Sequence, residues 1–95
     1  MGLIDLAWRR NCEKCHGSRG RGDGPEGVMV RAPDLTREDW QAKVSDEEMA
    51  EIIRKGKNKM PGFEAALPPP VIEGLVKRIR AARSKEEPRP TGGRR

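Results

Sequence analysis

The sequence predicts an all-α fold, and three observations support that prediction. In the last third of the chain, apolar residues recur at the i, i+3, i+4, i+7 and i+10 spacing of one helix face: Ile72, Leu75, Val76, Ile79 and Ala82. Ser45 and Glu48 have the spacing of a capping box, which marks the start of an earlier helix. Strand signals are nearly missing, because the run Val28-Met29-Val30 is too short to indicate a sheet.

The first part of the chain predicts one helix and a long irregular segment. Residues 3–14 predict a helix whose apolar residues form one stripe and its border: Leu3, Ile4, Leu6, Ala7 and Trp8. Residues 17–35 are rich in Gly and lack periodicity. Such a stretch is uncommon inside a compact domain unless it packs on something functional. Thr36 then begins a short turn or helix that contains Asp39 and Trp40.

The remaining elements have clear start and stop signals. Three acidic residues follow Ser45 and two basic residues precede Gly56, an arrangement that suits the dipole of a helix ending at that glycine. Pro68-Pro69-Pro70 stops the chain and starts the last helix. Residues 85–95 carry Pro, Gly and charge without apolar groups. We therefore expect one domain over residues 1–84 and a disordered basic tail over residues 85–95.

The composition is unusually polar for a folded chain of this length. Five Leu, five Ile, five Val and one Phe make 16 of 95 residues, which is below the roughly 20% at which a highly charged chain is expected to be disordered. Charged residues make up 37% of the chain, and the net charge is +5. The size excludes a large enzyme, and no run approaches 18 apolar residues, so we expect no membrane span. The sequence fits a disordered basic chain, a partner-dependent helix pair, or a small domain that takes part of its core from another group.

Both cysteines and the single histidine fall within five residues, Cys12-Glu13-Lys14-Cys15-His16. This Cys-x-x-Cys-His pattern is typical of c-type haem attachment. Two thiols three positions apart can each add to one vinyl group of a haem, and His16 then lies under the iron as an axial ligand.

Other roles for these residues have weaker support. A structural zinc site needs four Cys or His ligands, and the chain has three. A thioredoxin-like redox motif expects a preceding strand, and no strand signal precedes Cys12. A plain disulfide between Cys12 and Cys15 would leave His16 without a role.

Methionines are the candidates for the second axial ligand, because the chain has no second histidine. Met1 is the initiator, and Met49 has the helical spacing of a core residue. Met29 lies only 13 positions after His16, which makes the opposite face of a haem awkward to reach. Met60 precedes Pro61 in a loop bounded by glycines, and a thioether held in such a stiff loop suits an axial ligand. The alternative is that Met60 fills a gap under the loop.

Taken together, these motifs resemble the class I c-type cytochromes, in particular the small monohaem bacterial type, over roughly residues 4–83. The segments that carry the resemblance are Asn11-Cys12-Glu13-Lys14-Cys15-His16-Gly17, Ala32-Pro33-Asp34-Leu35-Thr36, Lys59-Met60-Pro61-Gly62-Phe63 and the last helix. The resemblance implies three to four helices packed around one covalently attached haem, with the first and last helices crossing. It implies thioether bonds from Cys12 and Cys15 and axial ligation by His16 and Met60.

The resemblance also implies roles for two further residues. The Pro33 carbonyl would accept a hydrogen bond from Nδ1–H of His16, the usual support for a ligating histidine. Trp40 would lie near the haem propionates, although a tryptophan in a small core can equally be a packing residue. The chain departs from the family at the helix crossing. Ile4 and Trp8 stand where the family has Gly and an aromatic residue, and Arg78 stands where it has an aromatic residue.

Axial ligation by His16 and Met60 would leave no open position for a substrate, which indicates one-electron transfer and no enzymatic activity. Two alternatives stay open. The first is a haem-based sensor or ligand-binding module with a displaceable Met60. The second is an accessory electron-transfer domain cut from a larger redox enzyme. Because an apolar haem would complete the small core, we expect the haem-free chain to be largely unfolded.

Basic residues bracket the predicted site on both sides: Arg9, Arg10, Lys14, Arg19 and Arg21, then Arg54, Lys55, Lys57 and Lys59. They would steer a monomeric carrier onto redox proteins with an acidic surface; the alternative is that they are solvated charges that keep a small domain soluble. No nucleic-acid-binding motif is present, so we expect no nucleic-acid partner. The family implies a periplasmic location. Because the chain begins without a signal peptide, we expect an exported mature form or a domain taken from a longer chain.

Overall fold

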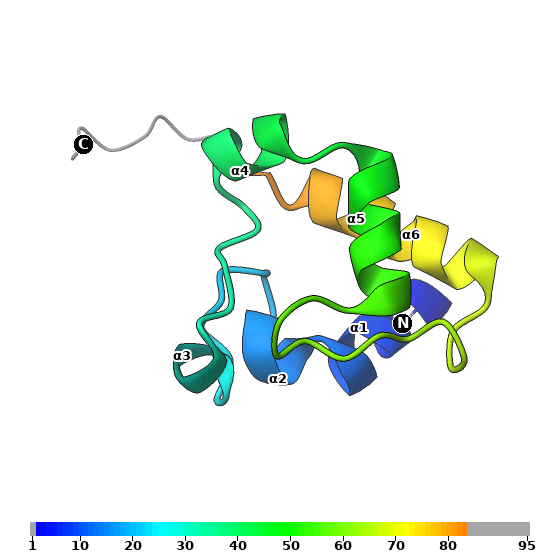
Figure 1. The fold of residues 1–95 in the computed structure, drawn as a ribbon, viewed down its shortest axis with the longest axis horizontal. Helices are drawn as coiled ribbons and strands as arrows, with labels where there is room; N and C mark the ends of the chain where they lie inside the picture. The colour runs from blue at the N-terminus through cyan, green and yellow to red at the C-terminus, as the bar shows by residue number, and fades with distance from the viewer. Residues whose placement is uncertain (1, 84–95) are drawn as a thin grey trace.

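A computed structural model describes residues 2–83, and within this range it is helical (Figure 1). The helices are α1 (Leu3–Asn11), α2 (Glu13–His16), α3 (Gly27–Val30), α4 (Glu38–Lys43), α5 (Asp46–Lys55) and α6 (Pro69–Ala81). Extended pairing within these residues is limited to an isolated bridge between Lys57 and Met60. The all-α prediction is therefore confirmed, while the predicted tail over residues 85–95 lies outside the described residues.

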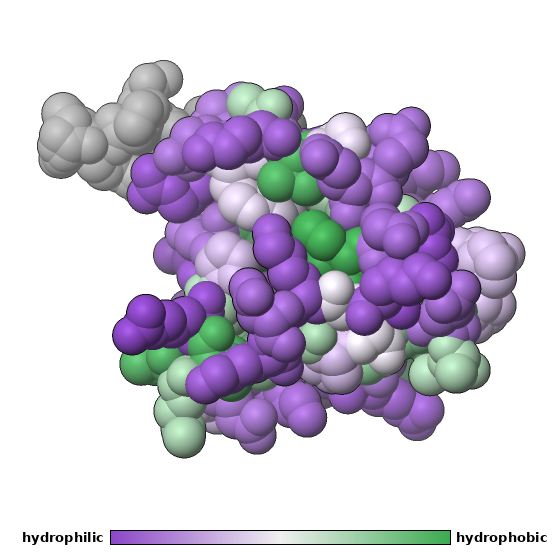
Figure 2. Space-filling view, in the orientation of Figure 1, coloured by the Kyte–Doolittle hydropathy of each residue, from purple (hydrophilic) through white to green (hydrophobic). Residues whose placement is uncertain are grey.

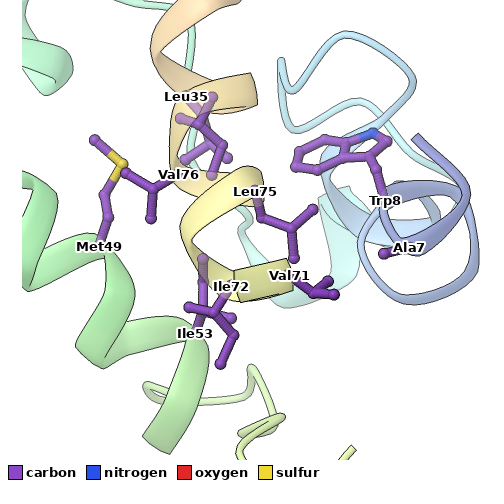
Figure 3. Close-up of a cluster of buried hydrophobic side chains, with 10 residues drawn as sticks. Ala7, Trp8, Leu35, Met49, Ile53, Val71, Ile72, Leu75 and Val76 are labelled. Atoms are coloured by element: carbon purple, nitrogen blue, oxygen red, sulfur yellow. The ribbon is translucent and has the colours of Figure 1, made fainter. Parts of the chain in front are cut away.

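The core is built on α6, which packs against both α1 and α5 (Figures 1 and 3). Its buried apolar residues come from both partner helices, from α6 itself and from the segment before α4: Ala7, Trp8, Leu35, Met49, Ile53, Val71, Ile72, Leu75, Val76 and Ile79. Ile72, Leu75, Val76 and Ile79 of the stripe predicted for the last helix are thus core residues, whereas Ala82 is the C-cap of α6 and is only partly buried. No helix between residues 2 and 83 is long and apolar enough to cross a membrane.

The termini of α5 and α6 follow the predicted local signals. The Glu48 backbone N–H donates to Ser45 Oγ at 3.0 Å, and the Ser45 N–H donates to the Glu48 carboxylate at 2.8 Å, which completes the capping box. Gly56 ends α5 with φ of 86°, a value that favours glycine. Prolines occupy the first positions of α6, where their missing N–H groups would have no helical partner.

The crossing of α1 and α6 is present, with small and large residues arranged differently from the family pattern. Gly74 of α6 faces Ile4 of α1, and a Cβ at position 74 would lie 2.7 Å from Ile4 Cγ1. The close approach therefore uses a glycine of the last helix and a bulky residue of the first. Arg78, in place of an aromatic residue, sets its guanidinium carbon 4.6 Å from the centre of the Trp8 ring. A cation–π contact thus replaces a contact between two aromatic rings.

The first helix is shorter than predicted. It was expected over residues 3–14, but α1 ends at Asn11 and α2 forms a separate turn. Cys12 has φ of −120° and ψ of −32°, which lies off helical geometry and changes the direction of the chain. Helical spacing of apolar residues cannot reveal such a break, because it depends on what packs around α2.

The glycine-rich segment after α2 folds back onto that helix. Three consecutive carbonyls of α2 accept hydrogen bonds from it: Glu26 N–H donates to Lys14, Gly24 N–H to Cys15, and Gly22 N–H to His16, at 2.8, 3.1 and 2.8 Å. A Cβ on Gly24 would overlap the carbonyls of Glu13 and Lys14, so glycine permits this close approach. The segment predicted to lack structure also contains the single turn α3. The segment therefore packs on the Cys-x-x-Cys-His turn, and its packing on a functional group stays a prediction.

A partly buried polar network fixes α4 against α6. The Gln41 side-chain amide donates to the carbonyls of Leu35 and Ile79 at 2.6 and 2.9 Å. Arg80 donates to the Gln41 and Val44 carbonyls at 2.6 and 2.5 Å and forms an ion pair with Asp46 at 2.7 Å. These bonds tie α4, which carries Trp40, and the start of α5 to α6.

Candidate functional site

An apolar cavity of about 460 Å³ lies beside the core, and each of the six helices contributes to its wall. Six of the ten buried core residues also line it: Trp8, Leu35, Met49, Ile53, Leu75 and Ile79. Figure 2 shows hydrophobic surface within a hollow that is bordered by hydrophilic residues. The volume falls within the range of about 300–1,000 Å³ for small-molecule and cofactor sites. The core of this chain is thus open on one side toward a space of cofactor size.

The α2 turn brings Cys12, Cys15 and His16 to this cavity, and all three residues line it. The N–H groups of Cys15 and His16 both donate to the Cys12 carbonyl, at 3.3 and 2.9 Å. This tight turn holds two partly buried free thiols and one imidazole along the same wall. The predicted attachment motif therefore has its three reactive side chains beside one apolar space.

The surroundings of the thiols do not favour redox or zinc chemistry. Burial raises the pKa of the Cys12 thiol to about 11, although the positive charge of Arg78 opposes this shift. Reactive redox cysteines have lowered pKa values instead. Among residues 2–83, no three His, Cys, Asp or Glu side chains are placed to hold a metal ion together. The zinc and thiol-redox alternatives to haem attachment therefore lack the expected geometry or electrostatics.

The His16 side chain is partly buried, and its ring lacks one expected hydrogen bond. Burial lowers its pKa, and interaction with the Pro33 backbone opposes that change. Neutral imidazole, which burial favours, is the form that ligates metals. Nδ1 of His16 is buried without a partner that satisfies ordinary hydrogen-bond geometry among the described residues. Pro33 lines the same cavity, and its role as acceptor for Nδ1–H stays a prediction.

Met60 reaches the cavity from a rigid turn after α5. The N–H of Lys57 donates to the Met60 carbonyl at 3.0 Å, and the N–H of Met60 donates to the Lys57 carbonyl at 2.9 Å. Asn58 supports the turn with φ of 55°. Phe63 N–H donates to the Ile53 carbonyl at 2.8 Å and holds the following segment against α5. The two hydrogen bonds between Lys57 and Met60 therefore close the turn that carries the partly buried Met60 side chain to the cavity.

The other described methionines have different surroundings. Met29 is 79% exposed on α3 and does not line the cavity. Met49 is 2% exposed and packs in the core, as predicted, with part of its surface on the cavity wall. Trp40 also lines the cavity and is partly buried, and its proximity to any propionate stays a prediction.

Trp8 is a site residue that the sequence reasoning assigned only to the first helix. Its indole Nε1–H donates to the Gly17 carbonyl at 3.0 Å, and its ring centre lies 6.0 Å from that of His16 at a tilt of 37°. The signal was present in the sequence, since Trp8 precedes Cys12 by one helical turn. The bond links the end of α1 to the residue after the attachment motif.

The charges around the cavity have one sign. Its lining includes five Lys and Arg residues and no acidic residue among those described: Arg10, Lys14, Arg31, Lys57 and Lys59. Four of these belong to the predicted basic bracket, and Arg31 is an addition. Arg54 and Lys55 of the bracket instead pair with Glu51 and Glu64, at 2.7 and 3.8 Å. The charged residues among the described lining of the cavity are therefore all basic.

Comparison with known proteins identifies the family of this chain. The family model described as cytochrome c oxidase, cbb3-type, subunit III matches residues 5–77. The solved structure of the KustC0563 c-type cytochrome is 30% identical, with a TM-score of 0.78 over 84% of this chain and 96% of that chain. A tyrosine-to-phenylalanine mutant of that cytochrome is also 30% identical, with a TM-score of 0.76 over 84% and 98%. No curated protein gives a significant match. The chain therefore belongs to the family of this cytochrome model and is a small c-type cytochrome, whose family chemistry is electron transfer by haem.

Proposed function

We propose that this chain transfers one electron at a time through a single haem c and is not an enzyme. In this proposal Cys12 and Cys15 hold the haem through thioethers, and His16 and Met60 are its axial ligands. One observation carries the proposal: all four side chains line the same apolar cavity, three from the turn at α2 and one from the turn after α5.

The residues present fit the group that the family implies. A bound haem supplies an iron that cycles between its ferrous and ferric states. The apolar side chains of the cavity wall would exclude water from much of the haem; they include Leu35, Ile53, Leu75 and Ile79. A thioether ligand and an apolar surrounding both favour the ferrous form, and a ligand set that suits both states keeps reorganisation small. The buried Nδ1 of His16 would donate to the Pro33 carbonyl and so fix the orientation of the ring.

Covalent attachment is tested by mass under denaturing conditions. The parent protein matured with haem should exceed the 10.6 kDa chain by one haem. Cys12→Ser and Cys15→Ser should each keep a single thioether and hold the haem less firmly, and the double variant should release it on denaturation. A parent chain without added mass, or a double variant that retains the haem after denaturation, would contradict the proposed attachment.

Acidic redox proteins are the partners that the cavity charges support. Among residues 2–83, five cations and no acidic residue line the cavity, so approach of a negative surface would be favoured at the place where the haem is reached. Val28 and Met29, which are 82% and 79% exposed on neighbouring α3, supply apolar surface beside these charges. A monomeric carrier with this surface would associate quickly and at a rate that depends on salt.

Exchange of one basic residue at the cavity tests this docking. Lys59→Glu should slow electron transfer with a small acidic flavoprotein by roughly 3–10-fold at low salt, and the difference should shrink at high salt. Lys77→Glu makes the same charge change on α6 at an exposed residue outside the cavity lining, so its effect should be smaller. Stopped-flow rates across a salt series give both values. Equal effects of the two variants would mean that net charge, and no local docking surface, sets the rate.

The description of the matching family also suggests the assembly and the compartment in which this carrier acts. The matching model is named for a subunit of an oxidase, which supports a version in which this domain passes electrons within a larger redox assembly. Cytochrome c domains of this kind are typically exported, and we place this one in the periplasm.

A further inference from the structure

A line of contacts leads from the surface of α1 to the ring of the proposed axial histidine. Asp5 accepts from Nε of Arg78 at 3.1 Å, and the Arg78 guanidinium lies over the Trp8 ring at 4.6 Å. The Trp8 ring in turn lies 6.0 Å from the ring of His16. Each member comes from α1, α2 or α6, so the helix crossing and the attachment motif share one set of contacts.

The charged guanidinium of Arg78 is partly shielded from solvent. Its side chain is 26% exposed, and Trp8, on which it stacks, is 2% exposed. The guanidinium also donates to the Ser18 carbonyl at 3.5 Å, just beyond the attachment motif. Its positive charge acts on the Cys12 thiol, where it opposes the rise in pKa that burial causes. Reduced solvent screening lets such a charge act further than a surface charge.

We propose that Arg78 raises the reduction potential of the haem iron, by placing a fixed positive charge behind Trp8 and His16 and by holding the Trp8 ring against His16. Arg78 is a positioning residue, and Asp5 partly offsets its charge. The ferric state carries one more positive charge than the ferrous state, so a nearby cation disfavours oxidation. The inference rests on the proposed ligation by His16.

The test uses the haem-loaded protein and a redox titration followed by absorption. Arg78→Gln should lower the reduction potential because it removes the cation, and Asp5→Asn should raise it because it removes the opposing anion. Arg78→Lys keeps the charge and loses the planar stack on Trp8, so it should lower the potential by less than Arg78→Gln does, while its Tm falls. Opposite shifts from the two ends of one ion pair cannot result from a loss of stability alone.

Arg80→Gln provides a matched control on the same helix. Arg80 is 27% exposed and also forms an ion pair with an aspartate, but its other bonds go to Gln41 and Val44. Its loss should lower Tm and shift the potential less than Arg78→Gln does. The proposal is overturned if Arg78→Gln and Asp5→Asn shift the potential in the same direction or leave it unchanged, or if Arg80→Gln shifts it as much. A parent protein without a low-spin, histidine-ligated spectrum would instead refute the proposed function.

Discussion

The haem-free chain should lose most of its helical structure and unfold without a cooperative transition, whereas the haem-bound chain should unfold cooperatively. Six of the ten buried core residues line the cavity, so the core is incomplete without an apolar group. Without such a group, the apolar side chains around this space of about 460 Å³ would face water, at a cost of roughly 25 cal/mol for each Å² of apolar surface left exposed. The whole stability of a small domain is only about 5–15 kcal/mol, so this loss favours unfolding.

Far-UV circular dichroism during heating measures this difference directly. The haem-free sample is the same chain produced without haem attachment, and the haem-loaded chain in the same buffer is the reference. Cys12→Ser with haem retained through Cys15 separates the loss of one thiol from the loss of the cofactor, and it should still unfold cooperatively. A haem-free chain with the helix content and sharp transition of the loaded protein would show that the composition alone sustains the fold.

Helix ends with local causes were predictable from the sequence. The capping box at Ser45 and the stop at Gly56 involve residues within a few positions of one another, and the prolines before α6 act within their own turn. The closeness of Cys12, Cys15 and His16 was predictable for the same reason, because these residues form one turn. These features need no knowledge of the rest of the chain.

Features that join distant segments could not be predicted in this way. The docking of residues 22–26 on α2 depends on carbonyls left open at the end of that turn, and no periodicity marks it. At the crossing of α1 and α6, Ile4 contacts Gly74 and Trp8 contacts Arg78. The two residues of each pair are about 70 positions apart in the chain. The resemblance indicated that the usual residues were missing there. Only the assembled helices show that a glycine and an arginine of α6 take their place.

Met60→Ala should remove the weak near-infrared band of a methionine-ligated ferric haem and lower the reduction potential on the order of 0.1 V or more. Axial ligands set haem potentials over a range of about 0.8 V, and a thioether lies toward the high end. Loss of the thioether should leave one coordination position of the iron open, so the reduced variant should bind carbon monoxide quickly. Met60→His should lower the potential while keeping six-coordinate iron. Absorption spectra of both oxidation states and a redox titration give these readouts.

Two other methionines allow the role of Met60 to be separated from the loss of any thioether. Met29→Ala makes the same chemical change on exposed α3 and should leave the spectrum and the potential unchanged. Met49→Ala removes a core side chain that also touches the cavity, so it should cost about 2–5 kcal/mol of stability while the near-infrared band persists. If Met49→Ala abolished the band and Met60→Ala kept it, Met49 would be the ligand. If the parent protein had no such band and bound carbon monoxide as fast as Met60→Ala, the open coordination position of a ligand-binding module would explain the site better than an electron carrier.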